Sequence, residues 1–495
     1  MMAKEKSISD EVKKYVSNID RDIYTVSNIP EEVVAVIFAY VSRSPKGFRE
    51  NIGNVIQEEQ LGQERAAKFH EKWVLNYGHA SVAEHAAVHV GIERVSRLFS
   101  SILELSNEYM SFTEYSQRYQ SPVKGDFFTP KELDQHSDLK HKYTELNNYQ
   151  YDIYSELNDK LYEFLKDTVP TPEGMEERIH HRALEKIAFE DARYSLNLAT
   201  YTNLGMTANA RAIEDSLSKL LSSRYSEVRD RAQEMKEEVR FSVPTLVKYA
   251  NENEYIVETR KSIDQLAQQT DINPSNNADK SYAVNLLNWT GKDSSNPEVE
   301  AINTMVKAIL FEHSEANYED INKSIDGSSL EDKLEILKRS IEKLGKFDNP
   351  VNALKLVKYD VEFVISEANW HQLLRHRKVN WVVQEPGIRS GITVPPHIEK
   401  SGTEDLLRKA VTESENLYKE LVENNLREVA SYVVTNAHNR RMLGNFDLWE
   451  LYHLVNLRMS EGAQWDIKNI TSILADKISE HHPNLVKPAL KRLGQ

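Results

Sequence analysis

The sequence predicts an α+β fold in which helices predominate. Apolar residues recur at three- and four-residue spacing through residues 217–240 and 404–434, a pattern typical of amphipathic helices. Two short runs, Val88–Ile92 ("VHVGI") and Val361–Ile365 ("VEFVI"), are rich in β-branched residues and predict strands. Helices and short strands are therefore expected together in the same domains.

The two halves of the chain repeat each other weakly but in the same order. Ser27–Ser44 and Ser294–Ser314 each contain a proline turn followed by a helical pattern, and residues 192–221 can be laid without gaps on residues 430–459. A polar segment with little apolar pattern separates the halves. The expected parts are a first repeat over residues 1–250, a linker over 251–281 and a second repeat over 282–495.

Composition excludes several classes of protein. The formal net charge of -15 argues against general nucleic-acid binding, which depends on basic residues. The absence of cysteine excludes disulfides, thiolate metal sites and a cysteine nucleophile. No signal peptide and no run of about 18 apolar residues is evident, so we expect a cytoplasmic protein without membrane spans.

Three polar motifs stand out against this acidic background. "LLRHRKVN" places Arg375, His376, Arg377 and Lys378 in a row, and its flanks "NWHQLL" and "VNWVV" are apolar. Basic runs are commonly solvated helix faces, but apolar flanks disfavour exposure here and indicate a small anionic ligand. Far upstream, "YGHASVAEH" and "SFTEYSQRY" (77–85 and 111–119) also gather polar side chains.

These motifs resemble those of flavin-dependent thymidylate synthases. The marks are "HASVAEH", the tail of "SFTEYSQRY" and "NAR" at 209–211. The family signature RHRxxSxNxxSxRY is divided here between the repeats. The first repeat keeps Ser111, Ser116, Arg118 and Tyr119, whereas the second keeps the Arg-His-Arg run. Thr113 stands where the family has asparagine.

The resemblance implies reductive methylation of dUMP to dTMP, with FAD as cofactor and NADPH and methylene-tetrahydrofolate as co-substrates. It also implies that each repeat has a mixed or antiparallel sheet with packed helices. Because family members are homotetramers with shared active sites, we expect a homodimer of fused chains that imitates the tetramer.

The resemblance assigns roles residue by residue. Arg458 would be catalytic, stabilising negative charge that develops on the uracil ring. The expected substrate-binding residues are Gln372, Arg375, Glu114, Ser116, Arg118 and Arg193. The expected FAD-binding residues are Ser42, His79, Ser81, Glu84, Asn209, Arg211, Arg375, His376 and Arg377.

Two alternatives remain open at this point. The enzyme would act on another pyrimidine nucleotide, or the chain would be a degenerate nucleotide- or flavin-binding homologue without turnover. His79 and His85 with Glu84 lack a fitting third ligand, so no metal is expected. Ser81 and Glu84 also have capping-box spacing, which is compatible with a purely structural role.

Overall fold

The computed structural model describes residues 12–40, 44–56, 66–71, 80–118, 120–270 and 283–494. The chain forms two compact units. The first unit comprises Met1–Tyr115 and Tyr201–Asn273, and the second comprises Ser116–Thr200 and Pro274–Gln495. The units do not coincide with the predicted repeats, because the segment 116–200 of the first repeat packs with the second repeat.

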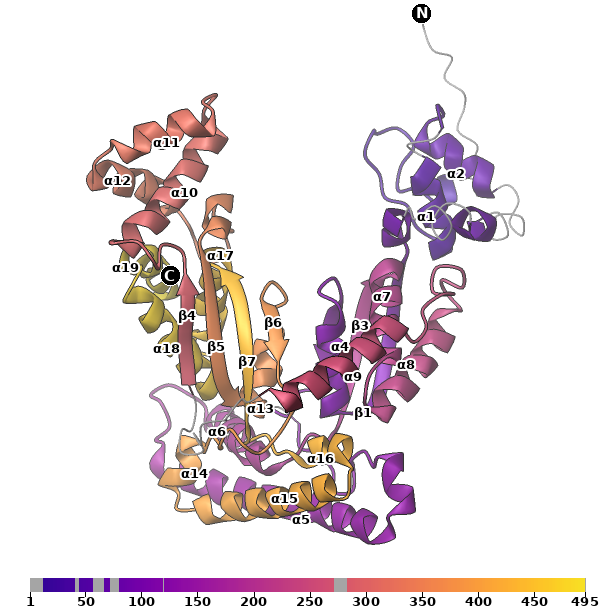
Figure 1. Ribbon diagram of the computed structural model, residues 1–495, viewed down its shortest axis with the longest axis vertical. Coiled ribbons are helices and arrows are strands. Elements are labelled where there is room, and N and C mark those ends of the chain that lie inside the picture. The colour runs from indigo at the N-terminus through magenta and orange to yellow at the C-terminus, as the bar shows by residue number, and fades with distance from the viewer. Residues whose placement is uncertain are drawn as a thin grey trace, which may run out of the picture. The chain divides into compact units, whose positions relative to one another are not determined.

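The first unit is built on a three-stranded antiparallel sheet in the order β1-β3-β2 (Figure 1). A β-bulge interrupts the pairing of β1 with β3 between Ile92 and Val95. The elements of this unit are η1 (Val12–Lys14), α1 (Glu31–Tyr40), α2 (Phe48–Ile56), η3 (Ala80–His85), β1 (Ala87–Ser96), α4 (Arg97–Ser106), β2 (Ser111–Glu114), β3 (Tyr201–Asn209), α7 (Ala210–Leu221), α8 (Ser226–Val239) and α9 (Glu254–Gln269).

The second unit is built on a four-stranded antiparallel sheet in the order β4-β5-β7-β6. Its sheet elements and their helices are β4 (Ala283–Trp289), α10 (Pro297–His313), α11 (Tyr318–Asp326), α12 (Leu330–Ile341), η6 (Asn352–Leu356), β5 (Lys358–Ser366), α13 (Glu367–Leu373), β6 (Asn380–Val383), β7 (Asn439–Asp447), α17 (Leu448–Arg458), α18 (Trp465–Ser479), α19 (Pro483–Lys491) and η7 (Arg492–Gly494). A helical layer adds η4 (Lys131–Gln135), α5 (Ser137–Thr168), α6 (Glu177–Ala192), η5 (Arg193–Ser195), α14 (Pro396–Lys400), α15 (Glu404–Glu423) and α16 (Arg427–Val433). One apolar core lies between the sheet and its helices, and a second lies within the helical layer.

The two sheets confirm the predicted duplication. The order β1-β3-β2 in the first repeat is the order β5-β7-β6 in the second, with β4 added at the outer edge of β5. Strands β1 and β5 contain the two predicted strands, and both run directly into helices, α4 and α13. Strands β3 and β7 likewise run into α7 and α17, as the gapless match of residues 192–221 with 430–459 requires.

Equivalent segments of the two repeats also meet each other inside the second unit. Leu198 N donates to Val434 O at 3.0 Å, and Asn436 N donates to Leu196 O at 2.7 Å. A second pair of bonds runs from Ala199 N to Tyr432 O and from Ala437 N to Tyr194 O, both at 3.0 Å. Since each bond has its counterpart in the other repeat, the segments are related by a local two-fold axis. Helices α5 and α15, one from each repeat, pack side by side next to this contact (Figure 1).

Three segments of the structure differ in detail from what the sequence predicts. The helical pattern of residues 217–240 is divided between α7 and α8, and that of 404–434 between α15 and α16. Asn425, with a φ of 61°, adopts the left-handed conformation that ends a helix. The predicted linker includes α9, which Asn253 caps by accepting from Tyr255 N and Ile256 N. Helix α9 has no buried residue, which is why its sequence lacks a clear apolar stripe.

Candidate active site

Basic side chains from both repeats lie together in the second unit. Arg118, which follows β2 in the first repeat, donates from Nε to Glu190 Oε1 at 2.7 Å and from Nη2 to Gly462 O at 3.1 Å. Gly462 lies in the turn that joins α17 to α18, four residues after Arg458. Ser116 Oγ accepts from Arg118 N at 3.2 Å and so fixes the turn that carries this arginine.

Arg458 carries the clearest electrostatic sign of an anion site. Burial, followed by the positive charges of Arg375 and Arg118, lowers the pKa of Arg458 to about 10. Glu450 opposes this shift without cancelling it, and the remaining repulsion among the cations favours an anion between them. Arg193 is buried in the same unit and Arg375 is half-buried, so the cluster suits a small ligand with more than one negative charge.

Gln372 adds a hydrogen-bond acceptor at the end of α13. Its Nε2 donates to Ala368 O at 3.2 Å and to Gln464 Oε1 at 3.3 Å, which identifies the other amide atom as the oxygen. No described residue donates to this buried Oε1. A buried acceptor without a donor is costly, so Gln372 is suited to an N–H group of a ligand.

His376 and Glu450 hold Arg458 from behind. Arg458 Nε donates to His376 Nε2 at 2.8 Å, and Arg458 Nη2 donates to Gln372 O at 2.9 Å. His376 Nδ1 lies 2.8 Å from Glu450 Oε1. Burial, reinforced by the charge of Arg458, lowers the pKa of His376 to about 3, so the ring is neutral near pH 7. Both ring nitrogens are thus bound within the protein, in contrast with the direct flavin contact expected for His376.

A buried carboxylate joins this region to the first repeat. Asp466, in the first turn of α18, accepts from Tyr194 Oη at 2.8 Å, Ser366 Oγ at 2.6 Å and Asn369 Nδ2 at 2.9 Å. Burial raises the pKa of Asp466, and the three donors oppose that rise. Because Tyr194 belongs to the first repeat, Asp466 ties this segment of the first repeat to the start of α13, the helix that carries Gln372 near its end.

His376, Glu450 and His453 lie close enough together to suggest a metal ion, with ligand atoms within 4.8 Å of one another. The hydrogen bonds argue against this interpretation. An arginine N–H can only donate, so His376 Nε2 is an acceptor and the ring proton is on Nδ1, the atom that faces Glu450. A metal at Nδ1 would move that proton to Nε2, where it would point at the Arg458 N–H.

Five described residues of the predicted set lie in the first unit. Arg211 forms an ion pair with Glu84, and both side chains are about half exposed. Asn209 caps α7 by accepting from Ala212 N at 2.9 Å, and Ser81 is exposed on η3. Glu114 is bonded to Arg97 at 2.5 Å and accepts from Thr202 at 3.1 Å, so its carboxylate is occupied within this unit.

The structure places the other predicted residues as follows. Arg377 is exposed in the turn after α13. His85, considered above as a metal ligand, stacks on Phe38 with ring centroids 4.8 Å apart. Ser42 and His79 lie outside the described residues.

Sequence reasoning missed Glu450, Gln464 and Gly462. Glu450 had a signal, because it precedes Arg458 by eight residues and therefore lies on the same face of α17. Gln464 is buried and caps α18 by accepting from Asp466 N at 3.1 Å. Gly462 contributes only its carbonyl oxygen, which no sequence pattern reveals.

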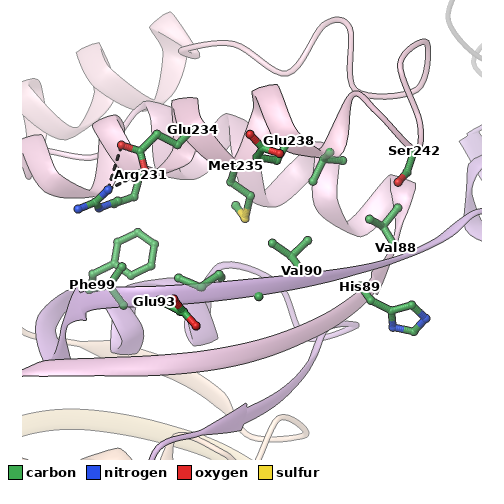
Figure 2. A pocket seen from close by; sticks show the side chains of 14 residues that line it. Val88, His89, Val90, Glu93, Phe99, Arg231, Glu234, Met235, Glu238 and Ser242 are labelled. Atoms are coloured by element: carbon green, nitrogen blue, oxygen red, sulfur yellow. Dashed lines mark hydrogen bonds and ion pairs between the residues drawn. The ribbon is translucent and has the colours of Figure 1, made fainter.

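A cavity of about 350 Å³ in the first unit has a different character. Figure 2 shows Val88, Val90 and Phe99 on one wall, with Met235 and an ion pair between Arg231 and Glu234 on the facing helix α8. Among the residues that line this cavity, the one arginine, Arg231, is paired with Glu234, so the lining differs from the arginine cluster of the second unit.

Comparisons with known proteins agree with the duplication. Residues 24–245 and 295–484 both match the family described as thymidylate synthase complementing protein. A UPF0159 protein of Chlamydia muridarum is 23% identical over 98% of this chain and 95% of its own length. A UPF0159 protein of Thermoplasma acidophilum is 24% identical over 90% of this chain and 93% of its own.

One further relative and one solved structure each match less than half of this chain. A flavin-dependent thymidylate synthase of Clostridium tetani is 29% identical over 45% of this chain and 82% of its own length. A solved UMP/dUMP methylase from Streptomyces cacaoi, bound with 5-Br dUMP, covers 42% of this chain and 94% of that chain at 11% identity. The TM-score of this match is 0.34. Within the described part of the chain, no helix is long and apolar enough to cross a membrane.

Proposed function

The chain belongs to the family of thymidylate synthase complementing proteins, and from this premise we propose that it converts dUMP to dTMP. Methylene-tetrahydrofolate would donate the carbon and leave as tetrahydrofolate. NADPH would supply the two electrons that reduce the methylene group to methyl. Relatives named flavin-dependent thymidylate synthases support a flavin as the carrier of those electrons.

The observation that carries the proposal is the cluster of Arg118, Arg375 and Arg458. Burial, and then the charges of Arg375 and Arg118, lower the pKa of Arg458. A phosphate monoester brings about two negative charges at pH 7, which would relieve this repulsion. We assign the phosphate to Arg118 and Arg375, with Ser116 and Arg193 beside them. Gln372 Oε1 would accept the N3–H of the uracil ring.

Arg458 would act on the ring itself. Its guanidinium is held by His376 and by Gln372 O, so it is oriented before any ligand binds. A fixed cation of this kind stabilises negative charge that develops on the ring when its C5 position becomes nucleophilic. The chain has no cysteine, so electrostatic activation replaces attack by a thiolate.

The residues fit FAD through their donor chemistry. Arg211 is a half-exposed cation in the first turn of α7, where backbone N–H groups favour anions, and this combination suits a diphosphate. Ser81, Glu84 and Asn209 of the same unit belong to the proposed set. Arg375 and Arg377 remain predicted flavin contacts. When bound, FAD supplies hydride chemistry that the side chains do not provide. Ser42 and His79 remain predicted flavin contacts outside the described residues.

We also propose the homodimer that the family resemblance implies. The symmetric bonds between residues 194–199 and 432–437 support the view that one chain already contains a contact between two repeats. Light scattering of the purified protein at micromolar concentration should then give twice the mass of the 57.1 kDa chain.

The test of function uses purified full-length protein. With FAD, NADPH and methylene-tetrahydrofolate, it should convert dUMP to dTMP, and it should support growth of a thymidine auxotroph. UMP and dCMP serve as competing substrates in the same assay. A well-folded yellow protein that methylates only UMP or dCMP would identify another pyrimidine nucleotide as substrate. No turnover with any of them would reject the proposal.

A further inference from the structure

We propose that Glu450 is a positioning residue, which holds His376 in one tautomer so that His376 can orient the Arg458 guanidinium. The proposal rests on the proposed function, because it assigns Arg458 a role at the substrate. It concerns three side chains of the second repeat that are joined by hydrogen bonds in series.

The direction of these bonds is determined by chemistry. Arg458 Nε–H can only donate, so His376 Nε2 must accept at 2.8 Å. The neutral ring then carries its proton on Nδ1, from which it donates to Glu450 Oε1 at 2.8 Å. In the opposite tautomer, His376 Nε2–H would point at Arg458 Nε–H. Glu450 favours the productive tautomer because it accepts a hydrogen bond from His376 Nδ1–H.

The two residues behind Arg458 are shielded from water. The side chains of His376 and Glu450 are 1% and 2% exposed. Burial raises the pKa of Glu450 to about 7, although the neighbouring His453 and Lys378 oppose the rise. Burying an acidic side chain is unfavourable unless its hydrogen bonds compensate for the lost contact with water. The burial of Glu450 therefore requires an explanation.

The first repeat shows that the fold does not require the three charged or polar groups. The serines that begin α4 and α13 (96 and 366) are equivalent, as are the residues that cap α7 and α17 (209 and 447). Counting from these caps, His376, Glu450 and Arg458 correspond to Ser106, Ala212 and Leu220. The equivalent strand-to-helix segments of the first repeat therefore form with small and apolar residues at these positions.

The effect on Arg458 is orientational. Nε is held by His376 and Nη2 by Gln372 O, whereas no described residue accepts a hydrogen bond from Nη1. Two fixed nitrogens define the plane of the guanidinium and leave the third nitrogen for a ligand. Misplacement of a reacting or stabilising group by about 1 Å can cost about 100-fold in rate.

The kinetic experiment compares two variants of the holoenzyme. Glu450→Met keeps the volume but removes the acceptor, and it should lower kcat about 10- to 100-fold with the dUMP dissociation constant changed less than about 3-fold. Glu450→Gln keeps an acceptor oxygen and should retain kcat within about 5-fold. Glu362→Gln is the matched control, because Glu362 pairs with Arg441 at 2.6 Å on the sheet of the same unit.

The second experiment does not depend on activity. ¹⁵N-histidine NMR, with His376 assigned through His376→Gln, should show a neutral ring protonated on Nδ1 in the wild type and in Glu450→Gln. His482 is an internal reference of opposite tautomer, since its Nε2 faces Thr290 O at 3.1 Å and must donate. In Glu450→Met the preference for Nδ1 should weaken.

The outcomes separate the two proposals. A wild type without turnover rejects the proposed function, and the NMR result still decides the tautomer. Protonation of His376 on Nε2 in the wild type overturns the positioning role. Unchanged kcat in a folded Glu450→Met variant overturns it as well.

Discussion

The two repeats share a scaffold but differ in the residues at one group of equivalent positions. In the second repeat, the turn after α13 carries His376 and α17 carries Glu450 and Arg458, whereas in the first repeat α4 carries Ser106 and α7 carries Ala212 and Leu220. Ser106 Oγ lies 2.5 Å from Ser216 Oγ, and Leu220 is buried. Small and apolar side chains are sufficient for the fold at these positions, so the buried polar and ionisable groups of the second repeat are best explained by chemistry.

Both repeats share one hydrogen-bonding arrangement at the start of a helix. Ser96 caps α4 and donates to Glu227 in the first turn of α8, at 2.5 Å. Ser366 caps α13 and donates to Asp466 in the first turn of α18. Both repeats thus have a serine between a strand and a helix that donates a hydrogen bond to a buried carboxylate. Only the second repeat also has the site residues His376, Glu450 and Arg458.

The sheet edges also differ. Strand β4 covers the outer edge of β5, whereas within the described ranges no strand pairs with the outer edge of β1. The cavity in Figure 2 lies along this edge. A bulge and Arg94, with a φ of 52°, distort β1 there, and such irregularity disfavours pairing with a foreign strand.

The largest expected effect contrasts Arg458 with its counterpart. Arg458→Ala should lower kcat about 100- to 1000-fold with little change in dUMP affinity, because the charge it stabilises grows in the transition state. Leu220→Ala should leave kcat of the folded protein unchanged and lower the free energy of unfolding by about 2 to 5 kcal/mol. Steady-state kinetics and denaturant titration measure the two effects. Equal loss of affinity and kcat in Arg458→Ala would place this arginine at the phosphate.

The next effect tests whether the site combines both repeats. Arg118→Ala and Arg375→Ala should each weaken dUMP binding about 10- to 100-fold, since each removes a charge-assisted hydrogen bond. Arg408→Ala, an exposed arginine paired with Glu404 on α15, is the control and should change nothing.

Co-expression of these two single variants sharpens the comparison. Arg118 and Arg375 lie in the same compact unit of one chain, so every chain in a mixture still lacks one of them. Activity should therefore not recover. Recovery in mixed dimers would show that each site takes these arginines from two chains.

A smaller effect is expected for Arg211 in the first unit. Arg211→Ala should weaken FAD binding by only about 2- to 5-fold, because its side chain is half exposed and its charge is screened. Fluorescence quenching of the flavin measures this change. Lys219→Ala, on the same helix and paired with Asp215, is the control. A loss of more than 100-fold would show that Arg211 becomes buried when FAD binds.

The smallest effect concerns pH and a histidine outside the site. Burial is the main cause that lowers the pKa of His482 to about 4, although its contact with Thr290 O opposes this. Between about pH 6.5 and 4 the unfolded chain binds a proton at this histidine that the folded chain does not, so stability falls as pH falls through this window. His482→Gln should flatten this part of the curve in thermal melts. An unchanged slope would show that other groups cause it.

Local pattern made much of this protein predictable. The strands at 88–92 and 361–365, the matched order of the repeats and the arginines of the divided signature are all visible in the sequence. Such features depend on neighbours in the chain, since strand and helix periods are set by a few consecutive residues.

Long-range packing decided the rest. The duplication, the family resemblance and the residue types of the site follow from the sequence alone. The packing of residues 116–200 of the first repeat with the second repeat, which brings Arg118 to the turn after Arg458, is visible only in the folded chain. The same is true of the contacts that His376 makes with Glu450 and Arg458. The burial and the hydrogen-bond partners of these side chains depend on residues that are far apart in the chain. His376 and Glu450, for example, are 74 positions apart.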